Sequence, residues 1–162
     1  RKYDTAMFKE KIDLIREVFP NAGLTTDIIV GFPGETEKNH QETIKFAKEI
    51  KFAKTHLFKY SKRAGTRAAK MKDQVNGNIK KERLKDLEAI EKINREEFLS
   101  KQIGKTLSVL FEEKSDMEGF KSGYSTNYLR VNVKNPSIPS NEIKDVIITG
   151  IKDDELIGEI SK

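Results

Sequence analysis

An acidic residue inside an apolar run, followed by a glycine turn, is the segment of this 162-residue chain best suited to hold a ligand. Residues 24 to 30 form a β-prone run, and Gly31, Pro33 and Gly34 end it. In α/β and barrel proteins, ligands lie where strands end at their carboxyl edge. The run predicts a strand buried on both faces of a parallel sheet, in which an unpaired carboxylate is costly. The Asp27 carboxylate is therefore predicted to be paired. Its partner could be a ligand or, equally, a local hydrogen-bond donor or a neighbouring lysine.

The glycine turn does not match a phosphate-binding loop. A P-loop requires two glycines five residues apart, followed by Lys and then by Ser or Thr. Here Gly34 is followed by Glu35, whose charge would repel a phosphate group. The pair Gly31 and Gly34 does not form a dinucleotide fingerprint either. The turn thus excludes a nucleoside triphosphatase and a Rossmann-type cofactor site.

The composition narrows the class of protein. The chain has no cysteine, which excludes disulfides, thiolate metal sites and cysteine nucleophiles within it. No apolar run approaches the roughly 20 residues of a membrane span, and the first residues do not form a signal-peptide pattern. Aromatic and β-branched residues recur in runs although 35% of the residues are charged, so we expect a packed, cytoplasmic protein.

The charge is unevenly distributed. Residues 1–102 carry 23 Lys and Arg against 16 Asp and Glu, a net charge of +7, whereas residues 103–162 carry a net charge of −2. A basic first part suits a polyanionic partner, but exposed lysines also keep proteins soluble. Charge alone therefore leaves nucleic-acid binding open.

Helices and strands are predicted to alternate in the first 60 residues. Apolar residues at three- and four-residue steps predict a helix over 5–19, and Thr36 is a good N-cap for a second helix that runs to about Lys51. Alternation predicts a strand over 55–60. This order predicts a right-handed parallel βα unit. His56 is expected to pack within its strand, because no second metal-binding side chain accompanies it.

A loop, a long helix and several short strands are predicted to follow. Residues 62–77 lack sustained periodicity and are predicted to be mostly loop, and an apolar stripe predicts a charged helix over 78–102 that connects two domains. The short β-prone runs lie at residues 106–111, 120–125, 128–133, 145–149 and 156–159. Five short strands in so few residues predict a small antiparallel barrel of the oligonucleotide-binding type.

Two ordered segments resemble one enzyme family. TTDIIVGFPGETE at residues 25–37 and HLFKYSKRAGTRAAKMKDQV at residues 56–75 resemble the radical S-adenosylmethionine (SAM) tRNA methylthiotransferases, and KKERL at residues 80–84 continues the pattern. The resemblance implies an α/β plus all-β fold. Residues 1–77 would form the C-terminal part of a partial radical-SAM (β/α) barrel, residues 78–102 a connecting helix, and residues 103–162 a five-stranded antiparallel TRAM domain, an OB-like barrel.

The resemblance also implies an activity for a longer parent protein. Members of the family add a methylthio group to a tRNA nucleoside or to a ribosomal protein side chain, with S-adenosylmethionine and two 4Fe-4S clusters as cofactors. Such clusters require cysteine thiolates, which this chain lacks. We therefore expect a C-terminal fragment that holds no catalytic residue and no metal ligand, binds none of these cofactors and is inactive alone.

Individual residues match positions of the family at the strand ends. Asp27 matches the strand acid beside the ribose of S-adenosylmethionine, and Ser61 matches a position whose backbone lies near the adenine, although a serine there is also a common turn residue. Lys62, Arg63 and Arg67 follow the second strand and are candidates to contact substrate phosphates. A solvated loop would have the same composition.

In the terminal domain, residues 119–131 resemble the core hairpin of TRAM domains. Lys121, Tyr124 and Arg130 are candidate RNA contacts, because aromatic rings stack on bases and cations hold phosphates. About half of the aromatic residues Phe120, Tyr124 and Tyr128 are expected to fill the barrel instead.

The resemblance favours a tRNA-modifying branch over the ribosomal-protein branch, because Lys62 and Arg63 are basic. His56 and the uninterrupted Ser61-Lys62-Arg63 resemble the branch that acts on threonylcarbamoyladenosine, which implies the anticodon stem-loop of tRNA as the partner. The isopentenyladenosine branch and a stand-alone, non-catalytic RNA-binding module remain alternatives. The sequence does not determine the oligomeric state, but an exposed sheet edge is expected to favour pairing with another copy.

Overall fold

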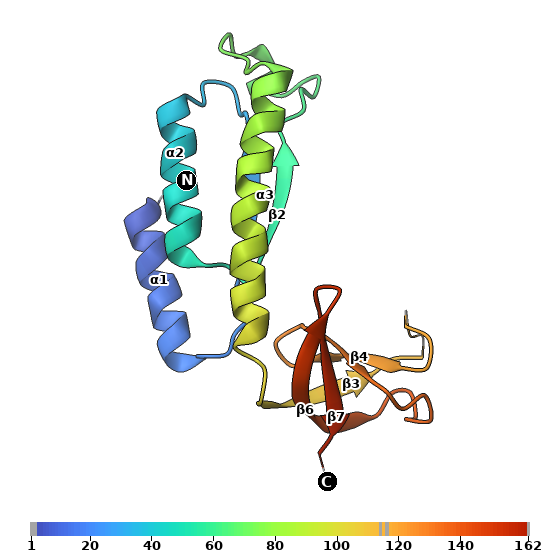
Figure 1. Ribbon diagram of the computed structural model, residues 1–162. Helices are drawn as coiled ribbons and strands as arrows, with labels where there is room; N and C mark the ends of the chain where they lie inside the picture. Colours follow the sequence, from blue (N-terminus) through green and yellow to red (C-terminus); the bar gives the residue numbers. More distant parts are fainter. Residues whose placement is uncertain (1–2, 114, 116, 162) are drawn as a thin grey trace. The chain divides into compact units, whose positions relative to one another are not determined.

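The computed structural model describes residues 3–113, 115 and 117–161, and the chain divides into two compact units. The first unit is Arg1–Pro20 with Leu24–Asn94, and the second is Asn21–Gly23 with Arg95–Lys162. Among the described residues, no helix is long and apolar enough to cross a membrane. The elements shown in Figure 1 are α1 (Thr5–Val18), β1 (Thr25–Val30), α2 (Glu37–Ile50), β2 (Lys54–Lys59), η1 (Ala68–Lys70), α3 (Gly77–Ser100), β3 (Thr106–Phe111), β4 (Lys121–Ser125), β5 (Arg130–Val133), β6 (Ile143–Lys152) and β7 (Glu155–Ile160).

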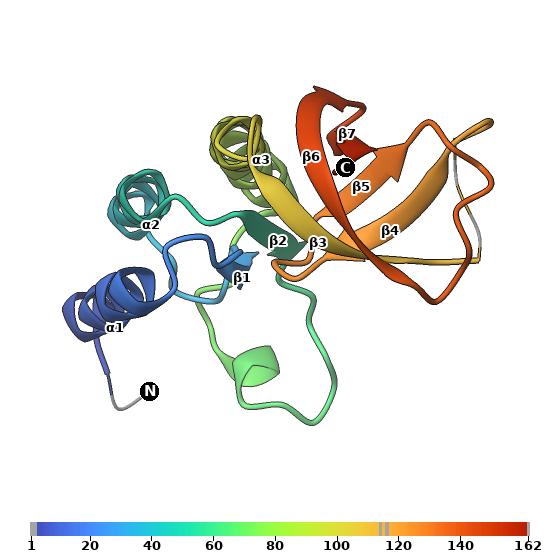
Figure 2. The same cartoon turned by 90° about the horizontal axis from the view of Figure 1, so that it is seen from below.

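The first unit contains the predicted parallel βα unit. Strands β1 and β2 pair in parallel, from Thr25 opposite Lys54 to Val30 opposite Lys59. Thr36 caps α2 through a capping box with Asn39, as its sequence predicts. Figures 1 and 2 show α1, α2 and α3 on one side of the strand pair. Buried apolar residues fill this side: Val30, Ala47, Leu87 and Ile90 in one cluster, and Ile12, Ile50 and Phe52 in another.

The other face of the strand pair is open, which contradicts the expectation of a strand buried on both faces. Asp27 and Ile29 on β1 are exposed, and so are their register partners on β2, His56 and Phe58. The prediction that His56 packs within its strand was therefore wrong. The reason is that side chains alternate between the two faces of a strand, and the helices cover only one of them.

The second unit contains a closed five-stranded barrel with the order β3-β4-β5-β7-β6. The barrel is mixed rather than antiparallel, because β5 and β7 pair in parallel while the other four pairs are antiparallel. Five strands cannot alternate in direction around a closed ring, so one neighbouring pair must be parallel. The core of the unit is apolar: Leu99, Leu107, Val109, Phe111, Leu129, Val131, Val133, Ile138, Val146, Ile148 and Leu156.

Candidate functional site

The loops that follow β1 and β2 meet at one end of the sheet, because the two strands are parallel. The backbone N–H of Tyr60 donates to the carbonyl of Val30 over 2.9 Å, and that of Gly34 donates to the carbonyl of Asp73 over 2.8 Å. Loop 31–36 and loop 60–76 are thus bonded to each other at the carboxyl edge. This is the edge at which parallel sheets hold ligands.

Glu35 closes the first of these loops. Gly31 and Gly34 have φ values of +70° and +84°, in the left-handed region that favours glycine. The carboxylate of Glu35 accepts a hydrogen bond from the backbone N–H of Gly31, and its side chain is only 13% exposed. Glu35 therefore has a structural role that the sequence analysis did not anticipate.

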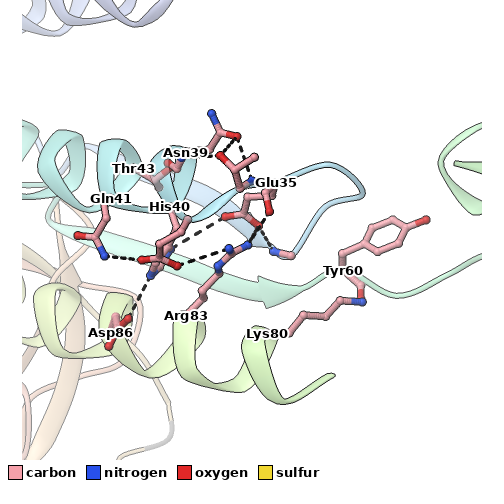
Figure 3. A network of polar contacts seen from close by, with 12 residues as sticks. Glu35, Asn39, His40, Gln41, Thr43, Tyr60, Lys80, Arg83 and Asp86 are labelled. Atoms are coloured by element: carbon pink, nitrogen blue, oxygen red, sulfur yellow. Dashed lines mark hydrogen bonds and ion pairs between the residues drawn. The ribbon is translucent and has the colours of Figure 1, made fainter. Parts of the chain in front are cut away.

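The first turns of α3 hold both loops (Figure 3). The guanidinium of Arg83 donates to the Glu35 carbonyl over 3.0 Å and lies 3.3 Å from the Glu35 carboxylate. Three residues earlier on the same helix face, Lys80 Nζ donates to the carbonyl of Tyr60 over 3.1 Å. We name Glu35, His40, Lys80, Arg83 and Asp86 the loop-holding cluster.

His40 is the most deeply buried member of this cluster, with an exposed fraction of 1%. Its Nε2 lies 3.1 Å from a carboxylate oxygen of Asp86, and its Nδ1 lies 4.0 Å from one of Glu35. The sequence analysis missed His40, although it precedes the apolar Ile44 and Ala47 by four and seven residues and so shares their helix face. That spacing is the one sign of its burial in the sequence.

Glu37, in the first turn of α2, borders the loop-holding cluster on its solvent side. A hydrogen bond from the side-chain amide of Gln41, together with the positive charge of Arg83, holds the pKa of Glu37 below its usual value. Its carboxylate lies 3.6 Å from Arg83. A carboxylate at this helix N-terminus is also favoured by the helix dipole. The charge of Glu37 therefore adds to the negative charge that faces Arg83.

Asp27 lies on the open face of the strand pair, not in a buried strand. Its carboxylate is exposed, and within the described residues nothing donates a hydrogen bond to it. The alternatives of a local hydrogen bond and of an ion pair with a neighbouring lysine are thus not seen here. The apolar side chain of Ile29 is exposed on the same face, and Phe58 lies opposite it in register. This face offers a carboxylate beside apolar surface.

The predicted basic positions lie in the exposed loop that follows β2. Ser61, Lys62, Arg63 and Arg67 are all exposed. The three cations form no ion pair within the described part of the chain. From residue 59 to residue 72 the chain carries six Lys and Arg and no Asp or Glu. The loop therefore presents uncompensated positive charge at the carboxyl edge of the sheet.

In the barrel, the structure brings two of the three predicted RNA contacts together. Tyr124 and Arg130 are register partners, and the guanidinium lies 5.0 Å from the ring centroid. Arg130 is only 9% exposed and forms an ion pair with Glu112. Lys121 is equally buried, and its Nζ donates to the hydroxyl of Ser140 over 2.7 Å. In this conformation Tyr124 is the exposed member of the set.

Metal-binding groups do not gather in the described part of the chain, where no three His, Asp or Glu side chains lie together in a way that could hold an ion. The candidate site thus consists of the open face with Asp27, the loop-holding cluster and the basic loop.

The chain resembles curated enzymes of known function, although no family model matches it. It is 40% identical over 134 residues to threonylcarbamoyladenosine tRNA methylthiotransferase MtaB of Bacillus subtilis, an alignment that covers 81% of this chain and 30% of the relative. It is also 40% identical over 164 residues to tRNA-2-methylthio-N(6)-dimethylallyladenosine synthase of Bacillus subtilis, and this alignment covers 98% of this chain and 32% of the relative. The synthase of the same name from Aliarcobacter butzleri is 37% identical over 161 residues, and this alignment covers 99% of this chain and 37% of the relative.

The chain spans about a third of the length of the curated relatives that it matches. Along its own length, however, the alignments with the two synthases cover 98% and 99% of the chain and so include both the strand pair and the barrel. In its sequence the chain is therefore a homologue of part of the tRNA methylthiotransferases, the family that its motifs resemble.

Proposed function

We propose that the chain is the C-terminal part of a radical S-adenosylmethionine tRNA methylthiotransferase that works on tRNA in the cytoplasm. The observation that carries the proposal is the open face of the strand pair, which lies beside an uncompensated basic loop at the carboxyl edge. The face suits the cosubstrate and the loop suits the phosphates of a polyanionic substrate. Both belong to a chain that is 40% identical to two such enzymes.

The residues on the open face fit S-adenosylmethionine. The free carboxylate of Asp27 would accept hydrogen bonds from the ribose hydroxyls, and the exposed apolar surface of Ile29 and Phe58 would suit the nucleoside ring. Ser61 follows β2 at the same end of the sheet. When bound, S-adenosylmethionine supplies the radical that starts the reaction. The 4Fe-4S clusters require thiolates, so their ligands lie outside this chain.

For the nucleoside, we favour threonylcarbamoyladenosine next to the anticodon, so that the partner is the anticodon stem-loop. His56 and the uninterrupted Ser61-Lys62-Arg63 support this branch. The rival is the isopentenyladenosine branch, since relatives named for each nucleoside match equally well at 40% identity. A stand-alone RNA-binding module is the alternative outside the enzymes.

Replacement of Lys62, Arg63 and Arg67 by alanine tests the proposed contact with tRNA phosphates. The slope of log affinity against log salt concentration is negative, and the loss of three contacts is expected to reduce its magnitude by roughly 2 to 3. The measurement is a tRNA binding titration at several salt concentrations. Replacing Lys38, Lys45 and Lys48 on α2 removes the same charge elsewhere and serves as the control. Equal slopes for the two triple variants would contradict the proposed role of the loop.

A further inference from the structure

Tyr128, in the turn between β4 and β5, has a side chain that nothing within its own unit explains. It is 87% exposed, the highest value among the exposed large hydrophobic residues. Its φ is +61°, in the left-handed region that is unfavourable for a residue with a bulky side chain. Glycine or asparagine would adopt this backbone at lower cost. Neither burial nor backbone geometry therefore favours a tyrosine here.

The turn that carries Tyr128 is firmly held. The Tyr128 N–H donates to the carbonyl of Ser125 over 2.9 Å, and the Leu129 N–H donates to the Ser125 hydroxyl oxygen over 3.1 Å. The same hydroxyl donates to the side chain of Asn127 over 2.6 Å. Leu129, the next residue, is 1% exposed and part of the barrel core. The ring is thus displayed on a rigid turn, so that little conformational entropy would be lost on binding.

A cation is attached to the same turn. The side-chain amide of Asn127 donates to the backbone carbonyl of Asn21 over 3.2 Å, and Lys105 Nζ donates to the side-chain oxygen of Asn21 over 2.6 Å. Both contacts lie within the second unit. The partner of Lys105 is a neutral amide, and no carboxylate of the described residues forms an ion pair with this lysine. Asn21 therefore links an exposed aromatic ring to an uncompensated positive charge.

We propose that Tyr128 stacks on an unpaired base of RNA while Lys105 contacts a neighbouring phosphate. An aromatic platform with a nearby cation is the combination that binds single-stranded nucleic acid, because every base has a flat face and every linkage carries a charge. The site is separate from Tyr124 and Arg130, whose guanidinium is paired with Glu112. The inference rests on the proposed function for the identity of the RNA as tRNA.

The test compares Tyr128→Asn with Tyr128→Phe in the 162-residue chain. Asparagine tolerates the left-handed backbone but removes the ring, so the melting temperature is expected to stay the same or rise. The probe is an RNA hairpin with a fluorescent adenine analogue in its unpaired loop. Tyr128→Asn is expected to lower hairpin affinity by roughly 5- to 150-fold and to abolish quenching of the analogue. Tyr128→Phe is expected to keep both.

A second variant measures the cation separately. For hairpin binding, Lys105→Ala is expected to reduce the magnitude of the slope of log affinity against log salt concentration by about 1. If the Tyr128→Asn variant kept the wild-type hairpin affinity and the wild-type quenching, the inference would be wrong. That result would hold whether Tyr128 contacts a protein instead or contacts nothing. If that result came with weaker binding by the Lys62, Arg63 and Arg67 variant, the proposed function would still stand. A wild-type chain that binds no RNA would overturn the inference and the RNA-binding part of the proposed function together.

Discussion

Replacing Arg83 by alanine is expected to destabilise the strand pair by about 3 to 5 kcal/mol. The side chains of Arg83 and Glu35 are only 7% and 13% exposed, so the change leaves the Glu35 carboxylate without its nearest cation in a place that water hardly reaches. It also removes the hydrogen bond to the Glu35 carbonyl. Native-state hydrogen exchange of the β1 and β2 amides measures this cost within the first unit.

Lys81→Ala is the matched control for this change. Lys81 lies on the same helix, two residues before Arg83, but it is exposed and forms no ion pair within the described residues. Its replacement is expected to change the opening free energy by no more than about 0.5 kcal/mol. If Arg83→Ala behaved like Lys81→Ala, the loop-holding cluster would not stabilise the carboxyl edge.

Replacing Gly123 by alanine is expected to destabilise the barrel by at least about 1 to 3 kcal/mol. A Cβ at this position would lie 2.8 Å from the carbonyl carbon of Leu110, and nearer still to its oxygen. These are backbone atoms of the paired strand β3, so the strands must separate. The register there joins Leu110 to Tyr124, and the exposed ring of Tyr124 would move with its strand. A lower melting temperature and faster exchange of the β3 and β4 amides would show this.

The barrel contains its own control in Gly150. A Cβ added there meets no atom within 4 Å, and the residue lies at the bulge of β6. Because β-sheet interiors disfavour glycine, Gly150→Ala is expected to leave stability unchanged or slightly increased. If Gly123→Ala and Gly150→Ala lowered the stability of the barrel equally, the close approach of the strands at Gly123 would not determine their pairing.

Local patterns predicted most of the elements of this chain. Apolar periodicity indicated α1 and α2, the capping residue Thr36 marked the start of α2, and the barrel strand β3 has the predicted bounds. These features depend on neighbours in the sequence, which is why they can be recognised there. The parallel β5–β7 pair was not predicted, since it follows from closing five strands into a ring and not from any one strand.

The candidate site was less predictable than the fold, because its members come from distant parts of the chain. Asp27 was recognised by its type and position, but its exposure depends on which faces the helices cover. His40 and Arg83 look like surface residues of charged helices, yet they meet at Glu35 across more than 40 residues of sequence. Likewise, the burial of Lys121 depends on Ser140 in another segment.

Mass spectrometry of tRNA nucleosides most directly tests whether the chain belongs to a tRNA methylthiotransferase. A strain that lacks the encoding gene is expected to lose the 2-methylthio group from threonylcarbamoyladenosine and to accumulate the unmodified nucleoside. The intact gene should restore the group, whereas a gene with Asp27→Ala should not. Loss from isopentenyladenosine instead would favour the rival branch. If every methylthio nucleoside kept its wild-type level, the proposed function would be wrong.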